Sequence, residues 1–187
     1  MFSRLTCALA LTAALTTSGF AQTAETEELD LGTPVTEGPQ VGDEYAKETF
    51  GDWIIRCVKT EDGNDPCSLY QLLVNETGQS VAEFTMLPLN NGGEAKAGAT
   101  VVAPLQTLLT EGMRLSIDGS QTRQYAFQFC NAVGCVVRFG LTEDFVTQFK
   151  RGAAATVQIV PANAPDSPVS LKVSLSGFTA AFDSLDK

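Results

Sequence analysis

Histidine is absent from the 187 residues of this chain, which removes several kinds of site at once. Nucleophiles activated by an imidazole, such as Ser-His-Asp and Cys-His arrangements, cannot form, and neither can a His-ligated metal centre. Basic residues are also few: 12 Lys and Arg stand against 22 Asp and Glu, which gives a net charge of −10 at pH 7. Because there is no basic patch, binding to nucleic acid or to an anionic membrane is disfavoured.

Long apolar runs are lacking as well. The run from Leu5 to Leu15 is too short to cross a bilayer, which takes about 20 residues. It follows the positive charge of Arg4 and precedes the small residues of Gly19-Phe20-Ala21, and this order is typical of a secretory signal peptide. We predict a signal peptide at residues 1–21, with a retained membrane anchor as the alternative. The mature protein is then expected to be periplasmic, or secreted and at the cell surface, with no integral membrane span.

Residues 22–48 carry eight Asp or Glu residues and one Lys, together with five Gly or Pro residues. Their apolar content is too low to form a core, so we predict an acidic, disordered leader. A spacer that aids solubility is its simplest role. An acidic arm that binds a partner is the alternative.

Residues 49–187 show short strand patterns separated by loops rich in Gly, Asn and Pro, and are long enough for one domain. Eight or nine strands at this spacing predict an all-β fold, either a single β-sandwich or a partly closed barrel. The predicted strands are Trp53–Val58, Ser68–Val74, Val81–Leu87, Thr100–Ala103, Met113–Ile117, Gln124–Phe129, Val136–Phe139, Ala155–Val160 and Val169–Ser176.

Two short helices are predicted among the strands. The first lies near residues 142–151, with Thr142 as its cap, two acids in its first turn and Gly152 as its stop. The second is C-terminal, and both present an apolar stripe that favours core packing over a cofactor site. The stripe of the second helix consists of Phe178, Ala181, Phe182 and Leu185.

Trp53 is the one tryptophan of the chain. It shares one face of a predicted strand with Ile55 and Cys57, while Ile54 lies on the other face, as the period of two requires. The β-branched pair at 54 and 55 favours a pleated conformation. We therefore predict Trp53 as a structural core residue.

Four of the five cysteines follow the predicted signal peptide, while Cys7 lies inside it. In an exported chain such cysteines predict disulfides. Of the three possible pairings we favour Cys57 with Cys67 and Cys130 with Cys135, because each pair flanks a short loop that contains Gly. A zinc site of four cysteines and a thioredoxin-like redox site are alternatives that these spacings disfavour.

Other chemistry finds little support. The S-x-x-K match from Ser184 to Lys187 ends the chain, where a cavity cannot easily form around it. Paired carboxylates for hydrolysis are set by spatial distance, and nothing in the sequence marks such a pair. The acidic stretch 61–65 resembles a calcium loop, but Cys67 and Leu73 occupy the positions that require Gly and Glu. We expect no catalytic residue, no cofactor and no metal.

Short motifs follow one another along the chain: Gly51-Asp52-Trp53 with Cys57 and Cys67, Pro104-Leu105, Glu111 to Leu115, the C-x3-G-C element Cys130 to Cys135, and Leu175 to Phe178. Their order and spacing resemble the invasion-associated locus B family, small exported proteins of alphaproteobacteria. The resemblance covers residues 49–187. It implies a periplasmic or cell-surface β-domain with disulfides, associated in some pathogens with host-cell invasion, and it supplies no catalytic residue. At Gln106 and Thr110 the family commonly has Gly and Pro.

The sequence thus predicts an exported, non-enzymatic binding or interaction protein of the periplasm or cell envelope, whose partner is an unknown envelope or host protein. The alternative is a periplasmic hydrolase that uses carboxylates or a Ser-Lys pair. A pocket lined by Asp or Glu with raised pKa values would favour the hydrolase. A shallow apolar surface patch would favour the binding protein.

Overall fold

The computed structural model describes residues 29–33, 38–90 and 92–185. The chain divides into two units, Met1–Thr36 and Glu37–Lys187. In the first unit, residues 29–33 are exposed and have no regular secondary structure. The predicted signal peptide lies outside the described residues. Within the described ranges, no helix has the length and apolar character needed to span a membrane.

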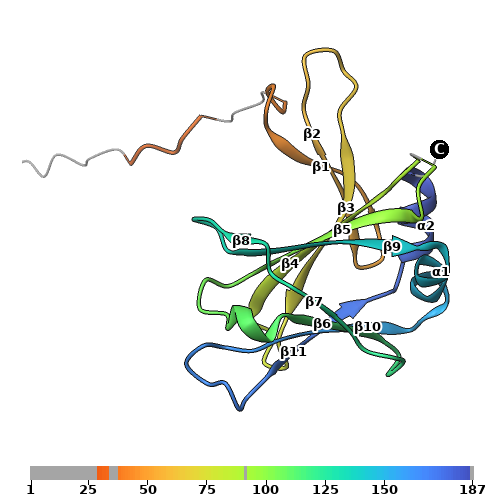
Figure 1. Ribbon diagram of the computed structural model, residues 1–187. Helices are drawn as coiled ribbons and strands as arrows, with labels where there is room; N and C mark the ends of the chain where they lie inside the picture. Colours follow the sequence, from red (N-terminus) through yellow and green to blue (C-terminus); the bar gives the residue numbers. More distant parts are fainter. Residues whose placement is uncertain (1–28, 34–37, 91, 186–187) are drawn as a thin grey trace, which may run out of the picture. The chain divides into compact units, whose positions relative to one another are not determined.

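The second unit is built mainly of antiparallel strands (Figure 1). Its described residues form one sheet of 11 strands. The strands are β1 (Glu44–Phe50), β2 (Trp53–Val58), β3 (Cys67–Val74), β4 (Ser80–Pro88), β5 (Ala95–Ala103), β6 (Met113–Ile117), β7 (Arg123–Tyr125), β8 (Phe129–Cys130), β9 (Cys135–Thr142), β10 (Ala154–Ile159) and β11 (Val169–Ser174). The helices are α1 (Glu143–Arg151), α2 (Phe178–Leu185) and a 3-10 turn at Leu109–Glu111.

The sheet curls into a partly closed barrel. Its strand order is β7-β6-β10-β11-β3-β4-β5-β9-β8, and the β1–β2 hairpin branches from β3. The two ends of this order, β7 and β8, follow one another in the chain and lie close together, because Tyr125 of β7 stacks on Phe139 of β9 with 4.2 Å between ring centroids. The all-β prediction is therefore confirmed, and the observed fold is the barrel form rather than two stacked sheets.

The inner face of the sheet forms the core. Along β2, Trp53, Ile55 and Cys57 are buried while the alternate residues are partly exposed. The same period of two fills the interior from β4, β5, β6, β10 and β11. At about 25 cal/mol per Å² of apolar area, this burial supplies most of the free energy that favours folding.

Both helices pack on the sheet, and a cluster of aromatic rings joins them to it. Phe149 of α1 and Phe178 of α2 lie 5.3 Å apart, and Phe178 lies 5.3 Å from Trp53. The two predicted helices are thus confirmed. Thr142 is the N-cap residue of α1, as predicted, and its side chain makes no capping hydrogen bond.

Three parts of the sheet differ from the prediction. Strand β1 begins at Glu44, so residues 44–48 belong to the sheet and not to a disordered leader. Strand β5 begins at Ala95 rather than Thr100. The single strand predicted at 124–129 is split into β7 and β8 around Gln128. The side chain of Gln128 replaces the missing ladder there: its Nε2 donates to the Arg138 carbonyl at 3.2 Å, and its Oε1 accepts from the Arg138 N–H at 2.7 Å.

Candidate functional site

Strand β3 has two neighbours on one side, β2 along its first half and β11 at its end. Gln71 lies where these two strands meet and is only 6% exposed. Its Nε2 donates to the carbonyl oxygens of Asp52 at 3.2 Å and Ser174 at 3.1 Å, and its Oε1 accepts from the Ser174 N–H at 2.8 Å. One amide side chain therefore completes the backbone hydrogen bonding at the β2–β11 junction, a role that the sequence prediction missed.

The motifs Gly51-Asp52-Trp53 and Leu175 to Phe178 meet at this junction. The Asp52 N–H donates to the Ser176 carbonyl at 3.1 Å, and the Ser174 hydroxyl donates to Asp52 Oδ2 at 2.5 Å. Gly177 has φ +82°, and a Cβ there would collide with the Phe50 carbonyl. The glycine thus allows two backbones to approach closely, which no other residue can do without strain. These motif residues hold the fold and form no catalytic arrangement.

Trp53 lies under the same junction. Its side chain is fully buried, and Nε1 donates to the Ser174 carbonyl at 2.8 Å. The indole meets Phe84 and Phe178 edge to face, with centroid distances of 5.9 and 5.3 Å. A buried, hydrogen-bonded indole of this kind is a packing residue, because neither its face nor its N–H is open to a ligand.

The four cysteines lie in the two predicted pairs. Cys57 and Cys67 face one another across β2 and β3 with an S–S distance of 1.95 Å, and Cys130 and Cys135 do so across β8 and β9 at 2.07 Å. In the chain-entropy account each bond constrains the unfolded state and contributes about 2–3 kcal/mol. No group of three or more Cys, Asp or Glu side chains within the described residues is placed to hold a metal ion.

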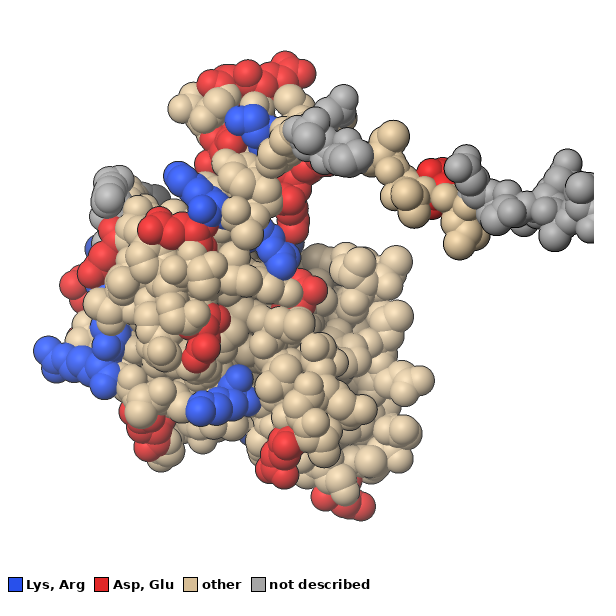
Figure 2. All heavy atoms as spheres, turned by 180° about the vertical axis from the view of Figure 1, so that it is seen from behind, with Lys and Arg blue, Asp and Glu red and all other residues tan. Residues whose placement is uncertain are grey.

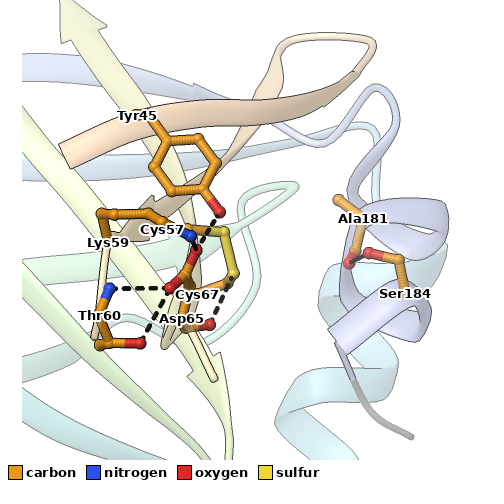
Figure 3. The surroundings of a disulfide bond; sticks show 8 residues. All are labelled: Tyr45, Cys57, Lys59, Thr60, Asp65, Cys67, Ala181 and Ser184. Carbon is orange, nitrogen blue, oxygen red and sulfur yellow. Dashed lines mark hydrogen bonds and ion pairs between the residues drawn. A yellow bond between two sulfur atoms is a disulfide. The ribbon is translucent and has the colours of Figure 1, made fainter. Parts of the chain in front are cut away.

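The loop closed by Cys57 and Cys67 is organised around Asp65 (Figure 3). Its carboxylate accepts from the Tyr45 hydroxyl at 2.7 Å, from the Thr60 N–H at 2.8 Å and from Lys59 Nζ at 3.1 Å. The Tyr45 hydrogen bond, followed by that of Thr60, holds the pKa of Asp65 well below its ordinary value. Acidic residues of 61–65 thus act as internal loop partners, which is a structural use and not that of a calcium loop.

Several residues that the hydrolase alternative could use are held by structural hydrogen bonds. The Ser184 hydroxyl donates to the Ala181 carbonyl at 2.7 Å within α2, and Lys187 lies outside the described residues (Figure 3). The pKa values of Asp62, Asp65 and Asp118 are all lowered, chiefly by hydrogen bonds from neighbouring residues. A lowered pKa keeps a carboxyl ionised near neutral pH, whereas a general acid needs a raised one.

The outer face of the sheet carries an apolar surface with two hollows. The first hollow, of about 440 Å³, lies beside β3 at the β2–β11 junction and is lined by Ile54, Tyr70, Leu72, Val74, Lys172 and Ser174, among others. The second, of about 370 Å³, lies over β3, β4 and β5 beside the loop between β8 and β9, and its lining includes Leu72, Val81, Glu83, Val102 and Val133. Figure 2 shows that charged groups are scattered and that uncharged atoms cover most of the surface seen from behind.

We call Leu72, Val74, Val81, Val102 and Val133 the outer-face patch. Leu72 is 45% exposed, Val74 40% and Val133 78%. Single exposed aliphatic side chains are common, but neighbouring ones that line the same hollows form a contiguous apolar surface. They come from β3, β4, β5 and the 130–135 disulfide loop. A shallow, mostly apolar surface of this kind can bind another surface.

Comparisons with known proteins agree with the fold. Residues 53–186 match the family model "Invasion associated locus B (IalB) protein". Two curated relatives are Invasion protein B homologs from Brucella abortus, strain 2308 and biovar 1 strain 9-941, each 28% identical over 137 residues, which is 73% of this chain and 77% of the relative. The crystal structure of invasion associated protein B from Bartonella henselae superimposes with a TM-score of 0.61 at 24% identity, covering 74% of this chain and 93% of that one.

The family match extends from Trp53 in β2 through both disulfides to the last turn of α2, so it spans nearly all of the described barrel. The resemblance deduced from the motifs is thereby confirmed: the chain belongs to the invasion-associated locus B family.

Proposed function

We propose that this chain is an exported, non-enzymatic binding protein of the periplasm or cell envelope. The observation that carries the proposal is the outer-face patch, where Leu72, Val74 and Val133 remain exposed on a sheet whose inner face is fully packed. Interaction surfaces differ from ordinary surfaces in having contiguous apolar area on a rigid support. The two disulfides and the junction at Gln71 provide that rigidity.

Export is supported by the signal-peptide pattern and by the disulfides. Cross-strand disulfides persist in oxidising compartments and are rare in the reducing cytosol. The relatives are named as invasion proteins, and for this chain contact with a host cell belongs to the proposal. Its direct partner is then an envelope or host protein.

The experiment is capture from an envelope extract of the producing organism on immobilised protein, compared with Leu72→Asp. Leu109→Asp is a matched control, because Leu109 is 42% exposed but lies on the 3-10 turn, outside the patch. We expect a partner that the wild type and the Leu109 variant retain and that the Leu72 variant loses. Equal capture by all three proteins would show that the outer-face patch does not bind the partner.

A hydrolase screen tests the alternative. Reproducible turnover that a single Asp or Glu substitution abolishes without loss of folding would overturn the proposal. We expect no such activity.

A further inference from the structure

Leu72 forms a ridge between two hollows on the outer face. It lines both the hollow at the β2–β11 junction and the hollow beside the disulfide loop, and 45% of its surface is exposed. A projecting apolar side chain next to an apolar hollow is complementary to a second copy of itself. In a two-fold contact each ridge enters the hollow of the other copy, because residue i meets j and j meets i.

Two opposite charges flank this ridge. Lys172 lies opposite Val74 on β11, and Glu83 lies opposite Leu72 on β4, so the two charges stand on opposite sides of β3. Both side chains are exposed. In the part of the chain that the structure describes, neither makes a hydrogen bond or ion pair.

A two-fold axis that lies in the interface and runs along β3 exchanges the two sides of that strand between the copies. It places β11 of one copy over β4 of the other, which brings Lys172 toward Glu83, and the symmetry makes the same pair a second time. We infer that the partner of the outer-face patch is a second copy of this chain, in a dimer in which the Leu72 ridges interlock and two Lys172–Glu83 pairs close the rim. This inference rests on the proposed function, since it names the partner of the same surface.

The charge balance of the patch favours a second copy over a partner of one sign. A cationic partner would pair with Glu83 but would face Lys172 across the interface, and an anionic one would have the reverse problem. The net charge of −10 opposes association of two copies. That repulsion is largely screened at about 0.15 M salt, where the Debye length is about 8 Å, whereas contacts across the interface are not.

The test is sedimentation equilibrium of the mature protein over a range of concentrations at about 0.15 M salt. We expect the wild type and Leu109→Asp to be dimers at high concentration. Leu72→Asp should remain monomeric at every concentration tested. The charge reversals Glu83→Lys and Lys172→Glu should each weaken the dimer about tenfold, because the symmetry makes each change act twice.

The double reversal, Glu83→Lys with Lys172→Glu, restores the pairing and should return the affinity to near that of the wild type. This rescue separates a specific interface from a general effect of charge or misfolding. A double variant no tighter than the single ones would overturn the paired charges, and a dimer unaffected by Leu72→Asp, for example one through the free edge of β1, would overturn the interface.

The failure of this inference is distinguishable from failure of the proposed function. A monomeric wild type that still captures an envelope protein through Leu72 would overturn self-association and leave the binding function standing. A monomeric wild type that captures the same proteins with and without Leu72→Asp would overturn both self-association and binding through the outer-face patch.

Discussion

Gly177 sets the geometry of the β2–β11 junction, and Gly78 in the turn between β3 and β4 provides a matched comparison. Gly177 has φ +82° and a Cβ there would collide with the Phe50 carbonyl, whereas Gly78 has φ +79° and open space around it. Ala at Gly78 should therefore cost only the backbone strain, about 1–2 kcal/mol. Gly177→Ala should cost about 4 kcal/mol or more, because two backbones must also separate.

Urea unfolding of the two variants measures this difference directly. Equal free energies of unfolding for Gly78→Ala and Gly177→Ala would mean that the close approach of the Phe50 backbone contributes nothing.

Trp53 should be the most costly side chain to remove. Trp53→Ala leaves a cavity beside Phe84 and Phe178, and we expect a loss of about 3–5 kcal/mol in the free energy of unfolding. Trp53→Phe keeps a ring and loses mainly the hydrogen bond to Ser174, so its cost should be about 1–2 kcal/mol. Because Trp53 is the one tryptophan of the chain, the native tryptophan fluorescence reports the environment of this residue. Emission like that of free tryptophan would contradict the core assignment.

Asp65 predicts a dependence of stability on acid. Hydrogen bonds, first that of Tyr45, hold its pKa below the ordinary value of 3.8. A group with a lowered folded pKa stabilises fully above its unfolded pKa, and this contribution is lost as pH falls toward the folded pKa. Between about pH 5 and about pH 2 the wild type should thus lose more stability than Asp65→Asn. Parallel pH profiles from chemical denaturation would show that the Asp65 carboxylate is not a stabilising acceptor.

The residues that could be predicted are those with a local pattern. Trp53 and the cysteine pairs follow from strand period and short spacing, and the structure places them accordingly. Gln71 and Ser174 could not be predicted as partners, because they are 103 positions apart and neither type is unusual in a strand. The outer-face patch could not be predicted either, because outward-facing Leu and Val look like core residues in a sequence.

At the scale of elements, β1 is the one that composition conceals. Three of its 7 residues are charged and five are exposed, as suits an edge strand, and only Tyr45 and Phe50 are partly buried. Such a strand has the composition of a solvated leader. It is nevertheless a strand, because β1 pairs with β2 and the Tyr45 hydroxyl donates a hydrogen bond to Asp65.

Two deletions test this boundary. Removal of residues 22–38 should leave the melting temperature nearly unchanged, because strand β1 and the hydrogen bonds of Gly42 and Asp43 to Lys59 remain. Removal of residues 22–48 takes most of β1 and Tyr45, and should lower the melting temperature by about 5–10 °C. Calorimetry of both proteins gives the comparison. An unchanged melting temperature in the longer deletion would show that residues 44–48 do not stabilise the sheet.

Strand β5 forms against the low strand propensity of its own sequence. The first half of β5 consists mainly of Ala and Gly, which have little strand preference. It is a strand because it pairs with β4 on one side and with β9 on the other. Small side chains are needed there, because a Cβ added at Gly140 would lie 2.9 Å from the Ala95 Cβ. Such tertiary pairing is not visible in a local window of sequence.

At the scale of the whole molecule, packed side chains fill the interior. Aromatic rings from both helices and from β2 and β4 fill the space between the helices and the sheet, and no buried side-chain N or O atom of the described residues lacks a partner. Fold class was predictable because many short amphipathic strands have few ways to bury one face. We propose that the outer-face patch is the binding surface and that a second copy of the chain is its partner.

Methyl NMR tests that claim most directly. In a dilution series of protein with labelled Leu and Val methyl groups, the resonances of Leu72, Val74 and Val133 should shift with concentration as the dimer dissociates. Those of Leu109 and Val146, which lie on the 3-10 turn and on α1, should not. Concentration-dependent shifts centred on the outer-face patch are the result that the structure predicts. No such shifts, or shifts confined to the helices, would contradict it.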